Sequence, residues 1–208
     1  MIILFDLDGT LIDSTEAILE SFGVAFKGFN KPVPLDEKIK AEIGHPLEVM
    51  FRTLGIEEKE TALYVHAYKE HYRKIFCAKT VLLPDAMKAI ELASKSATLG
   101  VVTTKTGKYS KELLEYFEVM HYFDVLIGSE DVINLKPHPE PIEKALKNLP
   151  KDTEVYMLGD TCMDMHSAKA SNVNAIGVTC GYGSEKSLKL CADKVYKNAL
   201  EAMKFIVK

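Results

Sequence analysis

Apolar and polar positions follow two different patterns along this chain. At the N-terminus and from about residue 80 onward, short apolar runs alternate with longer stretches in which apolar residues recur every three or four positions. The first run, Ile2-Ile3-Leu4-Phe5, is β-branched at its start and ends at a polar cluster, which is typical of a buried strand. Further strands are predicted at 98–103, 125–128, 154–158, 174–178 and 194–196. Because helical stretches separate these runs, the pattern predicts an α/β fold built on a doubly wound parallel sheet.

The segment from 15 to 79 shows only the helical pattern. Apolar residues such as Ile18, Phe22 and Ala25 recur at helix spacing, and no run resembles a strand. Glycine and proline residues divide the segment into expected helices at about 15–28, 35–44, 47–54 and 57–78. We therefore expect an all-helical domain, 15–79, inserted into a core domain that consists of 1–14 and 80–208.

Polar side chains gather where the predicted core strands end. Asp6 and Asp8 follow the first strand, and Thr103-Thr104-Lys105 follows the second. Lys136 lies in the loop after the third strand, and Asp160 and Asp164 follow the fourth. Singly, each has an ordinary interpretation as a helix cap, a turn or a surface lysine. Ligands of doubly wound sheets bind beyond the carboxyl ends of the strands, so together these residues predict one site.

The carboxylates in this set point to a hard cation. Strand alternation directs Asp6 and Asp8 to the same side, near the strand end. Two carboxylates that lie so close repel each other unless a cation lies between them or one of them takes a proton. Mg²⁺ prefers oxygen ligands of this kind, so we expect it as the cofactor.

Composition excludes several classes of protein. The 208 residues are 47% hydrophobic with a net charge of −4, which indicates a folded core and gives no sign of nucleic-acid binding. No apolar run approaches the roughly 20 residues of a membrane helix, and no signal peptide is evident. The glycine spacings fit neither a P-loop nor a dinucleotide fingerprint, and no HExxH motif occurs.

The cysteines suggest a reducing compartment. Cys77, Cys162, Cys180 and Cys191 form no CxxC pair, which argues against structural zinc and against a disulfide framework. We therefore expect a cytoplasmic protein. Cys162 lies among carboxylates, which disfavour a thiolate, so we interpret it as a packing residue rather than a nucleophile.

The order of these motifs resembles that of the haloacid dehalogenase (HAD) superfamily. The string from Asp6 to Thr10, DLDGT, resembles its first signature, DxDGT. Thr103 resembles the second motif, Lys136 the third, and Asp160 with Asp164 the fourth. The strings KPHPEP at 136–141 and GDTCMD at 159–164 are similar to those of the phosphoglycolate phosphatase-like branch, and the helical insert resembles its cap domain.

Two positions depart from the pattern of that branch. Thr104 stands where many relatives carry Asn, which would alter a phosphate contact. Asp85 follows Pro84 where relatives usually carry Gly, and we expect it to cap the following helix.

The resemblance implies a Mg²⁺-dependent phosphatase with a small phosphorylated metabolite as its substrate, phosphoglycolate being the leading candidate. Asp6 is then the nucleophile that forms an aspartyl-phosphate, and Asp8 is the general acid and base. Lys136 offsets negative charge, while Thr103, Thr104 and backbone N–H groups near Leu7 bind the phosphate. The implied Mg²⁺ ligands are the Asp6 carboxylate, the Asp8 backbone carbonyl and Asp160, with Asp164 binding directly or through water.

Several alternatives remain open within the superfamily. They are a pyrophosphatase, a sugar-phosphate phosphatase and a β-phosphoglucomutase-like enzyme. A dehalogenase is disfavoured because that branch lacks the second aspartate, which is present here as Asp8. Phosphonoacetaldehyde hydrolysis requires a cap lysine, and none stands in a recognisable motif. A non-catalytic binding protein would be expected to have lost an aspartate or Lys136.

Substrate selectivity is expected to come from the insert. Gly44-His45-Pro46 is the part of the insert least explained by helix packing, so we predict that His45 binds the organic part of the substrate. The alternative is a surface turn with an incidental histidine. No nucleic-acid or membrane partner is expected, and the chain is expected to be a monomer or a homodimer.

Overall fold

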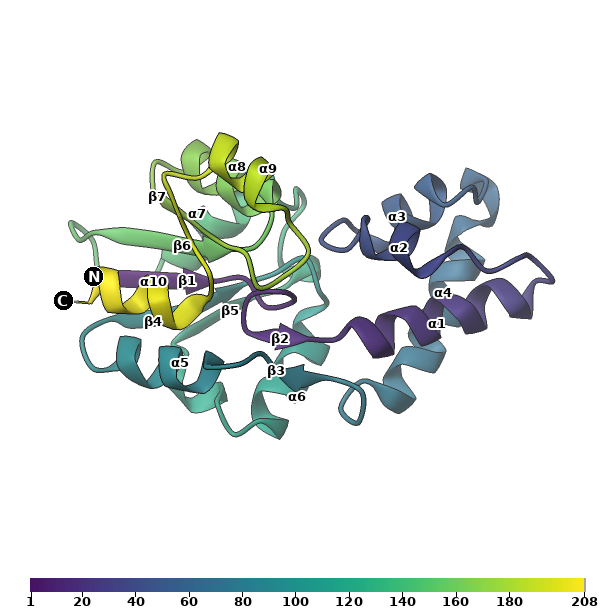
Figure 1. The fold of residues 1–208 in the computed structure, drawn as a ribbon, viewed down its shortest axis with the longest axis horizontal. Coiled ribbons are helices and arrows are strands. Elements are labelled where there is room, and N and C mark those ends of the chain that lie inside the picture. Colours follow the sequence, from purple (N-terminus) through teal and green to yellow (C-terminus); the bar gives the residue numbers. More distant parts are fainter. Residues whose placement is uncertain (208) are drawn as a thin grey trace. The chain divides into compact units, whose positions relative to one another are not determined.

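The computed structural model describes residues 1–207. Its strands are β1 (Ile2–Phe5), β2 (Ile12–Asp13), β3 (Val81–Leu82), β4 (Thr98–Val102), β5 (Val125–Ile127), β6 (Val155–Gly159), β7 (Asn174–Val178) and β8 (Lys194–Tyr196). The helices are α1 (Thr15–Gly28), α2 (Asp36–Lys40), α3 (Leu47–Thr53), α4 (Glu58–Ile75), α5 (Ala86–Ser94), α6 (Gly107–Tyr116), α7 (Glu140–Leu146), α8 (Cys162–Ala170), α9 (Glu185–Cys191) and α10 (Ala199–Ile206). Two short 3₁₀ helices cover Met120–Tyr122 and Ser129–Asp131. The chain divides into two compact units, Met1–Asp13 with Leu82–Lys208, and Ser14–Val81 (Figure 1).

The first unit is built on a six-stranded sheet in the order β5-β4-β1-β6-β7-β8. Every neighbouring pair of strands is parallel, which confirms the predicted fold class. β1 lies in the middle, and all four of its residues are buried, as its continuous apolar run predicts. The chain leaves β1 toward β4 and β5 and then returns to β6 on the other side of β1. The carboxyl ends of β1 and β6 therefore meet where the strand order reverses, the usual ligand position in such sheets.

Helices cover both faces of this sheet (Figure 1). α7, α8 and α9 pack in succession, with α8 against β6 and β7. α5 and α10 pack against each other and against the sheet. One core cluster joins buried residues of β1 and β6, Leu4 and Met157, to Met165 of α8 and Ile142 of α7. This packing fixes α8, and with it the residues at its N-terminus, relative to the ends of β1 and β6.

The second unit, Ser14–Val81, consists of α1 to α4 and the segments that connect them, and its last residue belongs to β3. α1 packs along α4, and aromatic rings fill the space between the helices. Phe51 lies 4.6 Å from Phe22, and Phe22 lies 5.1 Å from Tyr68, measured between ring centroids. The helix expected over 35–44 is shorter than predicted and ends at Lys40. Gly44 has a φ of +107°, which a helix cannot contain.

Two further expectations about local structure were incomplete or wrong. The two-stranded sheet of β2 and β3 was not predicted, because strands of two residues are too short to show alternation. Asp85 does not cap α5 with its side chain and instead adopts a left-handed conformation, with a φ of 64°. A glycine at this position would avoid the steric cost of that conformation, because it has no Cβ.

The expectation of no disulfide was also wrong. Cys162, the first residue of α8, is bonded to Cys191, the last residue of α9, with 5.8 Å between their Cα atoms. This pair could not be predicted, because the two cysteines lie 29 residues apart in the sequence and meet only through the packing of α8 on α9. The cytoplasmic location, which was inferred from reduced thiols, loses that support. Among the residues described, no helix is long and apolar enough to cross a membrane.

Candidate active site

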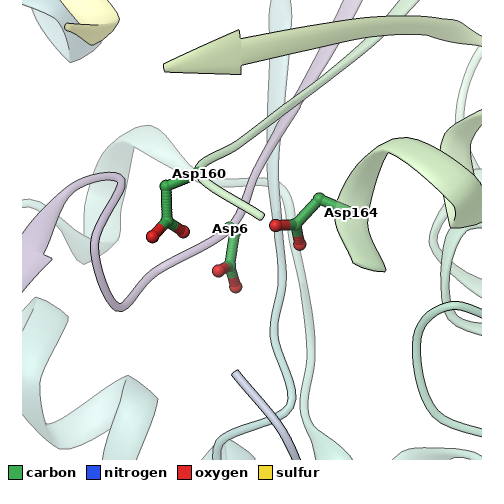
Figure 2. A group of neighbouring side chains, drawn as sticks. All are labelled: Asp6, Asp160 and Asp164. Atoms are coloured by element: carbon green, nitrogen blue, oxygen red, sulfur yellow. The ribbon is translucent and has the colours of Figure 1, made fainter. Parts of the chain in front are cut away.

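Three buried aspartates converge at the ends of β1 and β6. Asp6 follows β1, Asp160 follows β6, and Asp164 lies in the first turn of α8 (Figure 2). Their side chains can each place a carboxylate oxygen within 4.8 Å of the other two. Their exposed fractions are 6%, 0% and 1%. Carboxylates that are this close and this buried need cationic or hydrogen-bonding partners to remain ionised.

Lys136 supplies one such partner. Its ammonium group donates hydrogen bonds to Asp6 Oδ1 at 2.8 Å, to Asp164 Oδ1 at 2.6 Å and to the carbonyl oxygen of Val102 at 2.9 Å. The lysine is only 4% exposed, so these three acceptors replace its hydration shell. Lys136 therefore bridges the nucleophile candidate and the helix α8.

Asp164 is held by the start of its own helix. Thr161 is the N-cap of α8, and Asp164 is three residues further on, in the capping-box arrangement. The Oδ2 atom of Asp164 accepts hydrogen bonds from the backbone N–H of Thr161 at 3.0 Å and from its hydroxyl at 2.7 Å. Both carboxylate oxygens of Asp164 thus have protein donors, since Lys136 contacts the other one.

Asp160 is held mainly by backbone. Its Oδ2 atom accepts a hydrogen bond from the N–H of Tyr182 at 2.7 Å, and its Oδ1 atom accepts a long one, 3.4 Å, from the Thr10 hydroxyl. Gly9 and Gly181 give the carboxylate its space. A Cβ atom at Gly9 would lie 2.3 Å from Asp160 Oδ2, and one at Gly181 would lie 2.2 Å from it.

The carboxylates outnumber the lysine that contacts them, and their pKa values reflect this. Burial raises the pKa of Asp6 to about 7; Lys136 acts to lower it and Asp164 to raise it. Burial, together with the charges of Asp164 and Asp6, raises the pKa of Asp160 well above its usual range. Burial alone would lower the pKa of Lys136, but the charges of Asp164 and Asp6 raise it overall. The cluster therefore favours an additional positive charge, either a proton or a metal ion.

Asp8 lies outside this three-carboxylate cluster and has a lysine of its own. Its Oδ2 atom is 2.9 Å from the ammonium group of Lys105, and both side chains are largely buried. Lys105 follows Thr103 in the loop after β4, and its backbone N–H donates to the Thr103 hydroxyl oxygen at 3.2 Å. Thr103 is 3% exposed.

The comparison with known sequences identifies the family of this site. A sequence model of the haloacid dehalogenase-like hydrolase family matches residues 3–178. The chain belongs to this HAD family. The predicted resemblance to the HAD superfamily is therefore confirmed, together with the fold class.

Individual HAD relatives match nearly the whole chain. The probable phosphatase IndB of Dickeya dadantii is 33% identical over 201 residues, which cover 93% of this chain and 87% of the relative. The phosphoglycolate phosphatase of Colwellia psychrerythraea is 29% identical over 192 residues, covering 87% and 85%. A solved structure, the haloacid dehalogenase-like family protein SP0104 from Streptococcus pneumoniae, superposes with a TM-score of 0.90 at 28% identity, covering 99% and 97%.

Most of the site residues predicted from the sequence lie together in the HAD core. The structure gathers Asp6, Asp160, Asp164 and Lys136 directly around one another. Lys105 links two further predicted residues, since its ammonium group contacts Asp8 and its backbone N–H donates to the Thr103 hydroxyl oxygen. The backbone N–H of Leu7 hydrogen-bonds to the Asp6 carboxylate. Thr104 follows Thr103 and is half-buried.

The remaining predicted site residue, His45, lies in the other unit. It belongs to the helical unit, in the turn between α2 and α3, and its side chain is exposed.

Four residues that shape the site had no role assigned to them from the sequence. They are Thr10, Lys105, Thr161 and Tyr182. Thr161 had a usable signal, the Thr-x-x-Asp spacing of a capping box. Lys105 was visible at a strand end but had no predictable partner. Tyr182 contacts Asp160 through its backbone N–H, and such a contact cannot be predicted from the residue type.

Proposed function

We propose that this protein is a Mg²⁺-dependent phosphatase that hydrolyses a small phosphorylated metabolite through an aspartyl-phosphate on Asp6. The observation that carries the proposal is the buried Asp6 carboxylate, held by Lys136 beside two further carboxylates at the end of β1. Its HAD family membership and the names of its relatives, which are phosphatases, support a phosphoric monoester hydrolase.

The donor set fits a divalent cation. Three buried carboxylates and one buried ammonium group carry a net charge of −2 when all are ionised, and oxygen ligands suit Mg²⁺. Asp6, Asp160 and the backbone carbonyl of Asp8 would hold the ion. Asp164, whose oxygens accept hydrogen bonds from Lys136 and Thr161, would contact it directly or through water. The ion would neutralise charge on the phosphate oxygens and lower the repulsion between phosphate and Asp6.

In the first half-reaction Asp6 attacks phosphorus while the bond from phosphorus to the substrate oxygen breaks. Lys136 orients Asp6 and favours its ionised form, since it donates a hydrogen bond to Oδ1 of that carboxylate. Asp8 donates a proton to the leaving oxygen. Thr103, Thr104 and backbone N–H groups near Leu7, which follow β4 and β1, would donate hydrogen bonds to the transferring phosphoryl group.

In the second half-reaction water replaces the alcohol. Asp8 takes a proton from the attacking water, the acyl-phosphate bond breaks, and inorganic phosphate leaves with Asp6 restored. The same carboxyl group thus serves as acid and then as base.

Substrate choice is proposed to lie with the helical unit, 15–79 in the sequence prediction, acting as a cap domain. The phosphoglycolate phosphatases among its relatives make 2-phosphoglycolate the first substrate to test. A pyrophosphatase, a sugar-phosphate phosphatase and a β-phosphoglucomutase-like enzyme remain the alternatives. A panel of phosphorylated metabolites compared by kcat/KM would rank them.

The decisive experiment compares Asp6→Asn with Asp8→Asn. Asp6→Asn should form no phosphoenzyme and lose activity by at least about 10³-fold, because the attacking oxygen is gone. Asp8→Asn should still bind beryllium fluoride on Asp6 but turn over about 10²- to 10⁴-fold more slowly. Near-native turnover by Asp6→Asn, or full activity of the wild type in EDTA, would refute the proposal.

A further inference from the structure

Lys105 is a second cation at the site, with a largely buried side chain, and the proposed mechanism gives it no role. Its ammonium group lies 2.9 Å from Asp8 Oδ2, and the two side chains are only 10% and 14% exposed. Ion pairs on the open surface contribute little because solvent screens them and both side chains stay mobile. This pair is shielded on both sides, so it constrains the Asp8 carboxylate far more than a surface pair would.

The backbone of Lys105 is anchored at both of its peptide groups. Its N–H donates to the Thr103 hydroxyl oxygen at 3.2 Å, and its carbonyl oxygen accepts from the N–H of Ser129 at 3.0 Å. These contacts fix the loop between β4 and α6 at the end of the sheet. The side chain that contacts Asp8 therefore extends from an anchored loop.

Each aspartate of the first motif has a lysine as its ion-pair partner. Lys136 contacts Asp6, and Lys105 contacts Asp8. We propose that Lys105 is a positioning residue, which holds the Asp8 carboxylate in the orientation needed for proton transfer to the leaving oxygen. This inference rests on the proposed function, in which Asp8 is the general acid. A general acid contributes only when its geometry is right, so loss of Lys105 should weaken that one step.

A second role for Lys105 would be direct binding of the substrate phosphate. The two roles differ in which kinetic constant they affect. Loss of a residue that binds phosphate should affect every phosphomonoester alike. It should raise KM or weaken inhibition by inorganic phosphate. A residue that positions the general acid acts on kcat, and only when the leaving group needs a proton. The contact of Lys105 with the Asp8 carboxylate favours the positioning role.

Phenyl phosphate and p-nitrophenyl phosphate separate these roles, because they share a ring but differ in their need for an acid. Phenol, with a pKa near 10 like tyrosine, is the poorer leaving group. We expect Lys105→Met to lower kcat for phenyl phosphate by about 10- to 100-fold and kcat for p-nitrophenyl phosphate by less than about 3-fold, with KM nearly unchanged. Lys105→Arg should restore part of the loss. Lys108→Met, which removes an exposed lysine in the first turn of α6, is the matched control and should change neither.

The double variant Lys105→Met/Asp8→Asn provides the second test. If Lys105 acts through Asp8, the double variant should be no slower than Asp8→Asn alone, because the rate losses of residues that act as a unit are not additive. Equal loss on both substrates, a raised KM or additive losses would each overturn the inference and leave the proposed function standing. If Lys105→Met fails to fold, Lys105→Gln takes its place. Equal loss of activity on both substrates by Lys105→Gln would then overturn the inference. Absence of turnover by the wild type would overturn the proposed function and this inference with it.

Discussion

Gly9 and Asp160 lie against each other without room for a side chain between them. A Cβ atom on Gly9 would fall 2.3 Å from Asp160 Oδ2, and Gly9 also has a φ of +81°, which side-chain-bearing residues rarely adopt. Gly9, in the first motif, thus leaves the space for the carboxylate of Asp160, which belongs to the fourth motif and lies 151 positions further along the chain.

We predict that Gly9→Ala displaces Asp160 and destabilises the protein. The left-handed backbone alone costs about 1–2 kcal/mol, and the contact adds to it. Mg²⁺ affinity should fall as well, since Asp160 is a proposed ligand. Thermal unfolding with and without Mg²⁺ measures both effects. Gly23→Ala is the control, because no atom beyond its own stretch of helix lies within 4 Å of the added carbon. Ala also favours a helix interior, so this variant should be slightly more stable. A Gly9→Ala protein as stable and as Mg²⁺-responsive as the wild type would contradict the prediction.

The raised pKa values of Asp6 and Asp160 predict a pH dependence for the metal-free protein. Asp6 has a pKa of about 7 in the folded state, against 3.8 for an unperturbed side chain. Between these values the folded state binds more protons than the unfolded state, so the free energy of unfolding falls as pH rises. The stabilisation is complete below about pH 4 and lost above about pH 7, with a total on the order of a few kcal/mol.

Thermal unfolding in EDTA from pH 5 to 8 should show this decline relative to Asp160→Asn. That variant removes one of the repelling charges, so its Tm at pH 8 should exceed that of the metal-free wild type. Mg²⁺ should raise the Tm of the wild type at pH 8 but leave Asp160→Asn nearly unchanged. Parallel pH profiles for the two proteins would show that the cluster does not carry the effect.

The Cys162–Cys191 bond predicts a stability that depends on reductant. Closing a loop of 29 residues is expected to stabilise the fold by about 3–4 kcal/mol, which corresponds to a Tm difference of about 10 °C in a chain of this size. Dithiothreitol or Cys191→Ser should each produce that loss, and the two should not add. Cys77→Ser, at a cysteine outside the disulfide, is the control. Four titratable thiols in the unfolded protein as purified under air would rule the bond out.

His45 remains the predicted selectivity residue of the helical unit. His45→Ala should change the ranking of natural substrates, with about a 10- to 100-fold loss of kcat/KM for the preferred one, while p-nitrophenyl phosphate turnover falls much less. His66→Ala, an exposed histidine on α4, serves as the control. A parallel fall of both activities would assign His45 to folding or closure, and no change would make the turn incidental.

The sequence by itself determined the fold class and the region of the site. A strand or helix pattern depends on neighbours a few positions away, so β1 and α1 could be predicted from their own residues. The polar residues at the ends of the runs, Asp6 and Asp160 among them, fell near each other because parallel strands share one carboxyl edge.

Only the tertiary structure decided the remaining features, because they depend on contacts between distant segments or on backbone geometry. Lys105 acquired its partner Asp8, and Cys162 its partner Cys191, through the packing of β4 beside β1 and of α9 on α8. The left-handed φ of Asp85 is imposed by the junction of β3 and α5, although its residue type suggested a helix cap. Such features have no local pattern: the free energy that selects them comes from burial of surfaces that meet only when the chain is folded.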